Sequence, residues 1–263
     1  MQPITQTKQL ASPTPPALPP PSPLPAGGDE IAALQDHLET LDATGRLRWA
    51  AARFGDRAAI GTSFQGAGIV ALHLAAQAGL RIHAFTLDTG LLFPETLALK
   101  AELEARLGLV VETLAPAFTL DAQAREFGPR LWESDPDLCC ELRKVQPLQE
   151  KLAALDCWIT GVRREQSDTR ATTRVLELNE DASGHTLWKL NPLADWTREQ
   201  VQAHLRDHAL PWNKLLDRGY RSIGCAPCTR PTADGDGTGE RAGRWTGFGK
   251  KECGIHTFLK NKN

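Results

Sequence analysis

The 263-residue sequence has no run of eighteen apolar residues, almost no net charge and few cysteines. No segment is therefore expected to span a membrane. Its 30 Lys and Arg nearly balance 32 Asp and Glu, so there is no overall basic signature for nucleic acid. Six cysteines do not suggest the disulfide framework of a secreted scaffold. The start of the chain lacks a signal-peptide pattern, so we expect reduced thiols, a cytoplasmic protein, and no membrane or nucleic-acid partner.

Composition divides the chain into three parts. Residues 1–28 hold nine of the eighteen prolines and no acidic residue. Because proline lacks a backbone donor and fixes φ, we expect this leader to be disordered. Residues 29–229 have the composition of a globular domain. Residues 230–263 hold seven glycines and seven Lys or Arg, which predicts a flexible, locally basic tail.

Helix and strand patterns alternate in the middle part. Apolar repeats and a Thr197–Gln200 capping box predict helices over 29–54, 66–78, 94–107 and 197–209. Short apolar runs predict strands at 58–61, 81–87, 109–114 and 158–161, and a hairpin at 175–178 and 186–190. This alternation predicts an α/β fold, a single domain whose parallel twisted sheet carries helices on both faces.

Two strands end in polar or small residues at the same expected edge of the sheet. The first runs into Gly61-Thr62-Ser63-Phe64-Gln65-Gly66-Ala67-Gly68, whose N–H groups could bind phosphate together with the next helix dipole. It matches neither the P-loop nor GxGxxG, and an ordinary tight turn explains it equally well. The second ends in Leu87-Asp88-Thr89-Gly90, where Asp88 could contact a ribose or base, or cap the next helix.

Four cysteines form two pairs, Cys139-Cys140 and Cys225-x-x-Cys228. Four converging thiolates bind zinc or an iron–sulfur cluster, and a disulfide is the weaker alternative in a reducing compartment. Adjacent cysteines are unusual as ligands of one zinc ion, so the pattern favours iron–sulfur. Arg143 and Lys144 follow the first pair and either offset thiolate charge or lie on a solvated helix face.

The two remaining cysteines differ in their surroundings. Cys157 precedes an apolar strand and is interpreted as a small buried hydrophobic residue. Cys253 lies in the tail beside Lys250, Lys251 and His256. Because cations lower a thiol pKa, an exposed Cys253 on a mobile tail is either a nucleophile that visits a site or an idle thiol.

Arginines cluster after the fourth strand and in the tail. Guanidinium groups pair with phosphate and sulfate oxygens, so local clusters in a chain of small net charge favour a small anionic ligand, while a solvated surface explains any single one. The candidates are Arg163, Arg164, Arg170, Arg174, Arg241 and Arg244.

Taken in order, these motifs resemble the assimilatory sulfonucleotide reductases, which have the adenine-nucleotide α-hydrolase-like fold of PP-loop type. The resemblance extends from about residue 50 to residue 257. The matching segments are Ser63-Phe64 with Gly66, Leu87-Asp88-Thr89-Gly90, Cys139-Cys140-x-x-Arg143-Lys144, Thr160-Gly161-x-Arg163-Arg164-x-Gln166-Ser167, Asn191-Pro192-Leu193-x-x-Trp196, Arg218-Gly219-Tyr220-x-Ser222-Ile223-Gly224-Cys225, Cys228-Thr229 and Lys251-Glu252-Cys253-Gly254-x-His256.

The resemblance implies a nucleotide-binding reductase domain with a four-cysteine cluster site in residues 29–229, and a flexible tail in residues 230–263 that carries the catalytic cysteine. The family branch with both cysteine pairs carries a [4Fe–4S] cluster and typically reduces adenosine 5′-phosphosulfate (APS), whereas the branch without them reduces the 3′-phosphorylated form (PAPS). The loop here lacks the acidic residue that many relatives carry after Gly-Ala. The implied cluster ligands are Cys139, Cys140, Cys225 and Cys228. The implied substrate-binding residues are Ser63, Phe64, Gly66, Asp88, Thr89, Gly90, Arg163, Arg164, Arg241 and Arg244.

The resemblance also implies a mechanism. The Cys253 thiolate attacks the sulfate sulfur, AMP leaves, and reduced thioredoxin, or a glutaredoxin-like donor, releases sulfite from the S-sulfocysteine. Lys144 would neutralise the sulfate, and His256 would bind substrate or tune Cys253. The alternatives are reduction of PAPS, an ATP-pyrophosphatase-type enzyme that modifies a nucleotide or tRNA, and a zinc-stabilised nucleotide-binding protein without catalysis.

Overall fold

The computed structural model describes residues 27–180, 184–233, 239–247, 250, 252–256 and 258–261. Residues 1–26 of the predicted leader lie outside this part, as do Lys251 and most of the predicted hairpin turn. Within the described part, no helix is both long and apolar enough to cross a bilayer.

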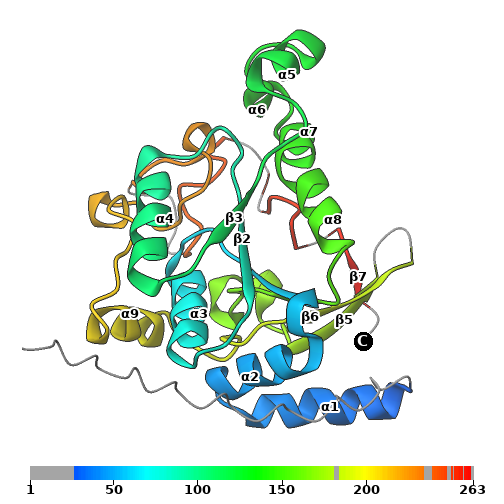
Figure 1. Ribbon diagram of the computed structural model, residues 1–263. Helices are drawn as coiled ribbons and strands as arrows, with labels where there is room; N and C mark the ends of the chain where they lie inside the picture. Colours follow the sequence, from blue (N-terminus) through cyan, green and yellow to red (C-terminus); the bar gives the residue numbers. More distant parts are fainter. Residues whose placement is uncertain are drawn as a thin grey trace, which may run out of the picture.

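A seven-stranded sheet forms the centre of the molecule, in the order β3-β2-β1-β4-β6-β5-β7 (Figure 1). Neighbours from β3 to β6 in this order run parallel. β5 and β6 form the predicted hairpin, and β5 runs antiparallel to both β6 and β7. The sheet is thus mostly parallel, with an antiparallel edge. The strands are β1 Ala58–Gly61, β2 His83–Leu87, β3 Val111–Leu114, β4 Cys157–Ile159, β5 Leu176–Glu180, β6 Thr186–Leu190 and β7 Lys260–Asn261.

The structure contains the predicted helices and, between residues 120 and 152, four further α-helices that the sequence did not predict. The predicted helix over 29–54 is two helices, because Asp42 starts a new one by accepting a hydrogen bond from the Gly45 N–H. The capping box of Thr197 and Gln200 opens α9 as predicted. The α-helices are α1 Gly28–Thr40, α2 Ala43–Phe54, α3 Gly66–Gln77, α4 Pro94–Leu107, α5 Leu120–Phe127, α6 Leu131–Ser134, α7 Pro136–Cys140, α8 Gln146–Leu152 and α9 Arg198–Asp207, and a π-helical turn, Glu141–Val145, joins α7 to α8.

The sheet is covered on both faces. Successive residues of a strand point to opposite faces. Ile60 of β1 packs into a core shared with α1, α2, α3, α4 and α9. Its neighbour Ala59 packs on the other side with Trp158 of β4 and with Leu148 and Leu152 of α8. The predicted two-faced α/β architecture is therefore confirmed.

The C-terminal segment completes the second face. Ile255, Phe258 and Leu259 pack against the core around Trp158. β7 pairs with β5 at the edge of the sheet (Figure 1). The described residues of the predicted tail are therefore docked on the domain, which local composition did not indicate.

The order of the strands locates a crevice. The chain runs from β1 outward to β3 and then returns to β4 on the other side of β1. Ligands of open α/β sheets bind beyond the carboxyl ends of the strands at such a reversal. Here the turns after β1 and β4 touch: a Cβ on Gly161 would lie 2.9 Å from the backbone nitrogen of Gly68. Only glycine allows this approach.

Candidate functional site

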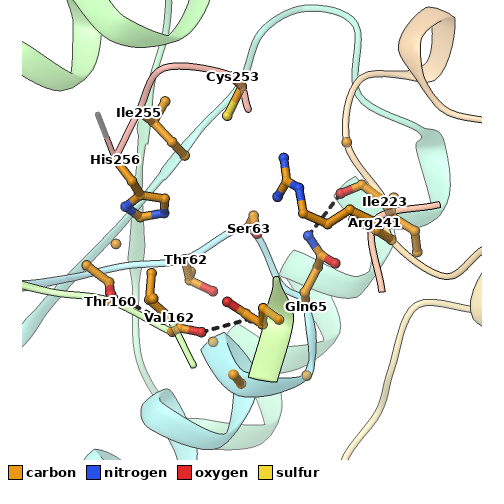
Figure 2. A pocket seen from close by; sticks show the side chains of 18 of the residues that line it. Thr62, Ser63, Gln65, Thr160, Val162, Ile223, Arg241, Cys253, Ile255 and His256 are labelled. Atoms are coloured by element: carbon orange, nitrogen blue, oxygen red, sulfur yellow. Dashed lines mark hydrogen bonds between the residues drawn. The ribbon is translucent and has the colours of Figure 1, made fainter. Parts of the chain in front are cut away.

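A cavity of about 270 Å³ lies beyond the ends of β1 and β4. The turn after β1 and residues 160–163 after β4 form one side, and the C-terminal segment forms another. Figure 2 shows Cys253 and His256 of that segment facing the cavity, across from Thr62 and Gln65. Gln65 is held in place because its side-chain amide donates to the Ile223 carbonyl at 3.1 Å.

The turn after β1 has the features of an anion-binding site. Ser63, Gly66 and Gly68 line the cavity. No side chain caps the first turn of α3, whose N-cap residue is Gln65. The first N–H groups of a helix lack intrahelical acceptors and lie at the positive end of its dipole. They are therefore available to a phosphate at this end of the cavity.

Three predicted substrate contacts lie elsewhere. Phe64 is 2% exposed and packs in the core. Asp88 does not line the cavity; its carboxylate accepts from the Gly90 N–H at 2.8 Å, and it does not cap α4, whose N-cap residue is Phe93. Gly90 also lies outside the lining. The physical reason is local, because the Asp88 side chain satisfies its own turn.

Thr89 links the end of β2 to the cysteines. Its hydroxyl lies 3.2 Å from the Cys225 sulfur, and its carbonyl accepts from the Arg143 guanidinium. Leu92 forms a β-bridge with Cys225. Although Thr89 also lines the cavity, its hydrogen bonds indicate that it positions the cysteine segments.

The cavity is rich in cations. Of the predicted residues, Lys144, Arg163, Arg170, Arg241 and Arg244 line it. Arg164 does not: its guanidinium pairs with Glu39 of α1 and donates to the Thr173 carbonyl. Neighbours along an extended chain point in opposite directions, so of Arg163 and Arg164 only one faces the cavity. The further lining arginines are Arg198 and Arg221.

Two carboxylates lie among these arginines. Glu240 accepts two hydrogen bonds from Arg163, at 2.7 and 2.9 Å. Glu252 pairs with Arg170 at 3.1 Å and with Arg241 at 3.2 Å. The charged side chains are therefore already ordered by ion pairs across the cavity.

Several polar atoms of the lining have no protein partner. Buried polar atoms without a hydrogen bond are rare, and such atoms indicate a site where a ligand or water binds. Among the described residues of the cavity lining, these atoms are Trp158 Nε1, Arg163 Nε, Arg244 Nε and His256 Nδ1. The site therefore presents nitrogen atoms suited to a ligand rich in oxygen.

His256 is a neutral group in this structure. Its ring stacks on Trp158 with centroids 5.1 Å apart and an angle of 13° between the planes. Burial, followed by the charges of Lys189, Arg170 and Arg241, lowers the pKa of His256 well below its usual value. A neutral imidazole can donate or accept a hydrogen bond, but it adds no charge.

The four paired cysteines gather beside the cavity. Cys139 and Cys140 end α7, Cys225 precedes the 3₁₀ turn at residues 226–228, and Cys228 ends it. All are free thiols. Burial, reinforced by neighbouring thiolates that include Cys225, raises the pKa of both Cys139 and Cys228 to about 11. The ionisation of these thiols therefore depends on the charge of their neighbours in the cluster of cysteines.

Cys253 lies against this group. It is 8% exposed and packs with Cys140 and Trp245, so the prediction of an exposed thiol is wrong. Although burial opposes ionisation, Lys144, the Ile255 N–H, Arg244 and Arg241 together lower the Cys253 pKa. Lys144 comes from a distant part of the chain, whereas Arg241 and Arg244 precede Cys253 by twelve and nine residues.

Lys144 interacts electrostatically both with the paired cysteines and with Cys253. It is 8% exposed and lines the cavity. Burial alone would lower its pKa, but the charges of Cys225, Cys253 and Cys140 raise it. Lys250, expected near Cys253, instead binds Asp137 and the Pro136 carbonyl.

The lining residues that sequence reasoning missed include Gln65, Trp158, Arg198 and Arg221. Gln65 lies inside the loop that sequence analysis singled out, and Arg221 lies next to the Ser222-Ile223-Gly224-Cys225 motif. Their positions in or beside these motifs could have identified both as candidate site residues. No such signal exists for Trp158, which has the pattern of a core residue, or for Arg198, which has that of a helix-surface residue. Only the packing of the folded chain turns them toward the cavity.

Comparison with known proteins gives a consistent result. The model of the phosphoadenosine phosphosulfate reductase domain matches residues 57–231. The adenosine 5′-phosphosulfate reductase of Streptomyces coelicolor is 44% identical over 232 residues, 87% of this chain and 95% of its own. The phosphoadenosine 5′-phosphosulfate reductase of Gloeobacter violaceus is 43% identical over 206 residues, 77% of this chain and 83% of its own.

A solved structure shares the fold. The phosphoadenylyl-sulfate (PAPS) reductase from Candida auris, in a phosphate complex, matches with a TM-score of 0.69 and 30% identity. The match covers 80% of this chain and 100% of that chain. Since the family model spans most of the domain, this chain belongs to the phosphoadenosine phosphosulfate reductase domain family.

Proposed function

We propose that this chain is an oxidoreductase that reduces adenosine 5′-phosphosulfate to sulfite and AMP, with Cys253 as the nucleophile. The observation that carries the proposal is the position of the Cys253 thiol. It lies beside a cation-lined cavity that can hold a phosphosulfate, within the electrostatic reach of Lys144, Arg241 and Arg244. The reaction belongs to sulfate assimilation.

The first step is attack of the Cys253 thiolate on the sulfate sulfur. A Cys253 S–S bond forms, the S–O bond to the phosphate breaks, and AMP leaves with the electron pair. Lys144 and Arg244 would stabilise the sulfate oxygens, while the N–H groups at the start of α3 would hold the nucleotide phosphate. Burial of Cys253 keeps water from competing for the sulfur.

The second step requires an external dithiol, for which we propose reduced thioredoxin or a glutaredoxin-like protein. One donor thiolate attacks the Cys253 sulfur, so that sulfite leaves with the electron pair of the broken bond. The second donor thiol then resolves the mixed disulfide and regenerates Cys253. The donor supplies both electrons. Because all six cysteines are free thiols, we also propose a reducing compartment, the cytoplasm.

Cys139, Cys140, Cys225 and Cys228 would hold a [4Fe–4S] cluster. No three sulfurs among these described cysteines lie within 4.8 Å of one another. On one tetrahedral zinc ion, four sulfurs would lie about 3.8 Å apart. The wider spacing supports a multinuclear cluster. When bound, the cluster would supply electrostatic stabilisation beside Lys144 and hold the two cysteine segments together.

The proposal is tested by sulfite release from anaerobically purified protein with reduced thioredoxin. A brown protein that releases sulfite from APS is expected, and APS and PAPS are offered in competition because relatives carry both names. Cys253→Ser should abolish sulfite release and leave the cluster spectrum intact. Cys157→Ser is the matched control, since Cys157 is the first residue of β4, is fully buried in the core and does not line the cavity.

Two results would contradict the proposal. One is normal sulfite release by Cys253→Ser. The other is a colourless, zinc-containing protein that is inactive on both nucleotides but releases pyrophosphate from ATP, which would favour an ATP-pyrophosphatase-type enzyme.

A further inference from the structure

Three histidines meet on the side of α3 and α9. They are His73 of α3, His204 of α9 and His208, which directly follows α9. One ring nitrogen of each lies within 4.8 Å of the other two. His73 Nδ1 is 2.9 Å from His204 Nε2. The two helices lie side by side (Figure 1).

We propose that these three histidines bind a divalent transition-metal ion of the zinc class. Imidazole nitrogens are good ligands for such ions. At a Zn–N distance near 2.1 Å, nitrogens in a tetrahedral site lie about 3.4 Å apart. The present spacing therefore requires only small side-chain movements. His204 and His208 are four residues apart, which places them on one helical face.

Burial disfavours the charged form of two of the three rings, His73 and His204. Burial, followed by the charge of His208, lowers the pKa of His73 and lowers that of His204 to about 4. Both rings are therefore neutral at pH 7 and carry a free lone pair. In the His73–His204 contact only one of the two facing nitrogens can donate, and a metal ion would accept electron pairs from both.

The surroundings contain charges of both signs. Arg106 of α4 lowers the His73 pKa and donates to the His208 carbonyl at 3.3 Å. Asp207 raises the His204 pKa and would favour a bound cation. Trp196 contacts the His204 ring edge-on, with centroids 5.7 Å apart. The ion would lie at a half-buried position, with the charge of the Arg106 guanidinium acting against it.

The ion would join two elements of the proposed active site. The start of α3 forms the anion-binding turn, and Val201 of α9 lines the cavity. At that end the helices already touch, since a Cβ on Gly66 would lie 2.8 Å from Val201 Cγ1. The histidines link the same helices further along. Three protein ligands leave a fourth position for water or another small ligand.

The test uses cluster-containing protein without a polyhistidine tag, freed of adventitious metal and titrated anaerobically with zinc chloride in equilibrium dialysis. One equivalent of zinc with a micromolar or lower Kd is expected. His204→Gln and His208→Gln should each weaken binding at least about tenfold, because losing a residue that merely orients a metal ligand already costs that much. His83→Gln is the matched control, since His83 lies in an exposed pair with Asp56.

A second readout is thermal unfolding. Zinc at a hundred times its Kd should raise Tm by about 5–10 °C in wild type and His83→Gln, but not in His204→Gln. The titration is repeated in Cys253→Ser, because thiolates also bind zinc. Neither readout uses sulfite release, so this inference can fail without the proposed function.

Three outcomes would overturn the inference. The first is no zinc retained by wild type at about 100 μM free ion, which is far above the expected Kd. The second is equal affinity in wild type and His204→Gln. The third is binding that disappears in Cys253→Ser but survives in His204→Gln, which would assign the ion to the thiol.

Discussion

At the scale of single residues, the site depends on groups whose ionisation is set by burial. His256 is the clearest case, because its pKa lies well below the ordinary histidine range. Its imidazole is therefore neutral at pH 7. Its contribution to the reaction must come from hydrogen bonding and from its stack on Trp158.

This predicts the pH dependence of the reaction. The profile of kcat/KM between pH 6 and 8 should contain no limb due to His256. His256→Asn keeps a hydrogen-bonding group, and it should lower the rate without changing the shape of that profile. A limb near pH 6.5 that is present in wild type and absent from His256→Asn would contradict the assignment.

Gly224 has a comparable role through its lack of a side chain. A Cβ there would lie 2.2 Å from Nη2 of Arg244, and Arg244 lines the cavity over the Trp245 ring. Gly224→Ala should displace the guanidinium and reduce kcat/KM by about a hundredfold. Stability should change little, because a flexible side chain can move.

The matched control for Gly224→Ala is Gly239→Ala, where a Cβ would meet nothing within 4 Å. Steady-state kinetics and thermal unfolding of both variants distinguish displacement of the Arg244 guanidinium from a general loss of stability. Equal activity of the two variants would show that the position of Arg244 is unimportant.

At the scale of elements, one buried arginine connects the first two helices to the sheet. Arg46 is 1% exposed. It donates to the Leu38 carbonyl at the end of α1, to the Pro192 carbonyl and to both carboxylate oxygens of Asp195. Arg46→Met leaves these acceptors without donors, so we expect a loss of about 3 kcal/mol in the free energy of unfolding.

The loss should depend on pH. Burial raises the Asp195 pKa, but the hydrogen bonds from Arg46 outweigh it and lower that pKa in the folded state. The pair therefore stabilises the fold above the ordinary pKa of aspartate, and the contribution fades as the pH falls through the lowered value. The difference between wild type and Arg46→Met in urea unfolding should narrow below about pH 4.

The control for Arg46→Met is Arg57→Met. Arg57 pairs with Asp156 at 2.5 Å, but the two side chains are 55% and 37% exposed. Exposed pairs contribute about 1 kcal/mol or less. Similar losses in the two variants would contradict the role assigned to burial.

At the scale of the whole molecule, activity depends on a segment that folds back over the domain. Phe258 and Leu259 pack against the core of the second face and so help to hold Cys253 at the cavity. Replacing both by alanine should speed amide exchange across residues 252–259 and lower activity more than stability. The expected loss of stability is about 2 kcal/mol, because both side chains are only partly buried.

Leu97→Ala provides the control, because Leu97 is 45% exposed on α4. Hydrogen exchange followed by mass spectrometry locates the change. If exchange rose throughout the sheet in the Phe258 and Leu259 variant, the segment would be part of the global core and not a separately docked element.

The sequence alone determined the features that arise from local chemistry. β1 and α4 match their predicted bounds, because apolar period, strand length and Pro94 at the start of a helix act over a few residues. The capping box of α9 is local for the same reason. The ordered motifs also indicated the family, since spacing along the chain carries that information.

The tertiary structure decided which side chains share the cavity. Arg164 and Asp88 carry suitable chemistry but satisfy local partners, whereas Trp158 and Arg198 read as ordinary residues and line the cavity. Cys253 reads as exposed in a glycine-rich segment, yet packing against Cys140 buries it. These outcomes depend on contacts between segments far apart in sequence, whose energies local patterns do not contain, so only the folded chain determines them.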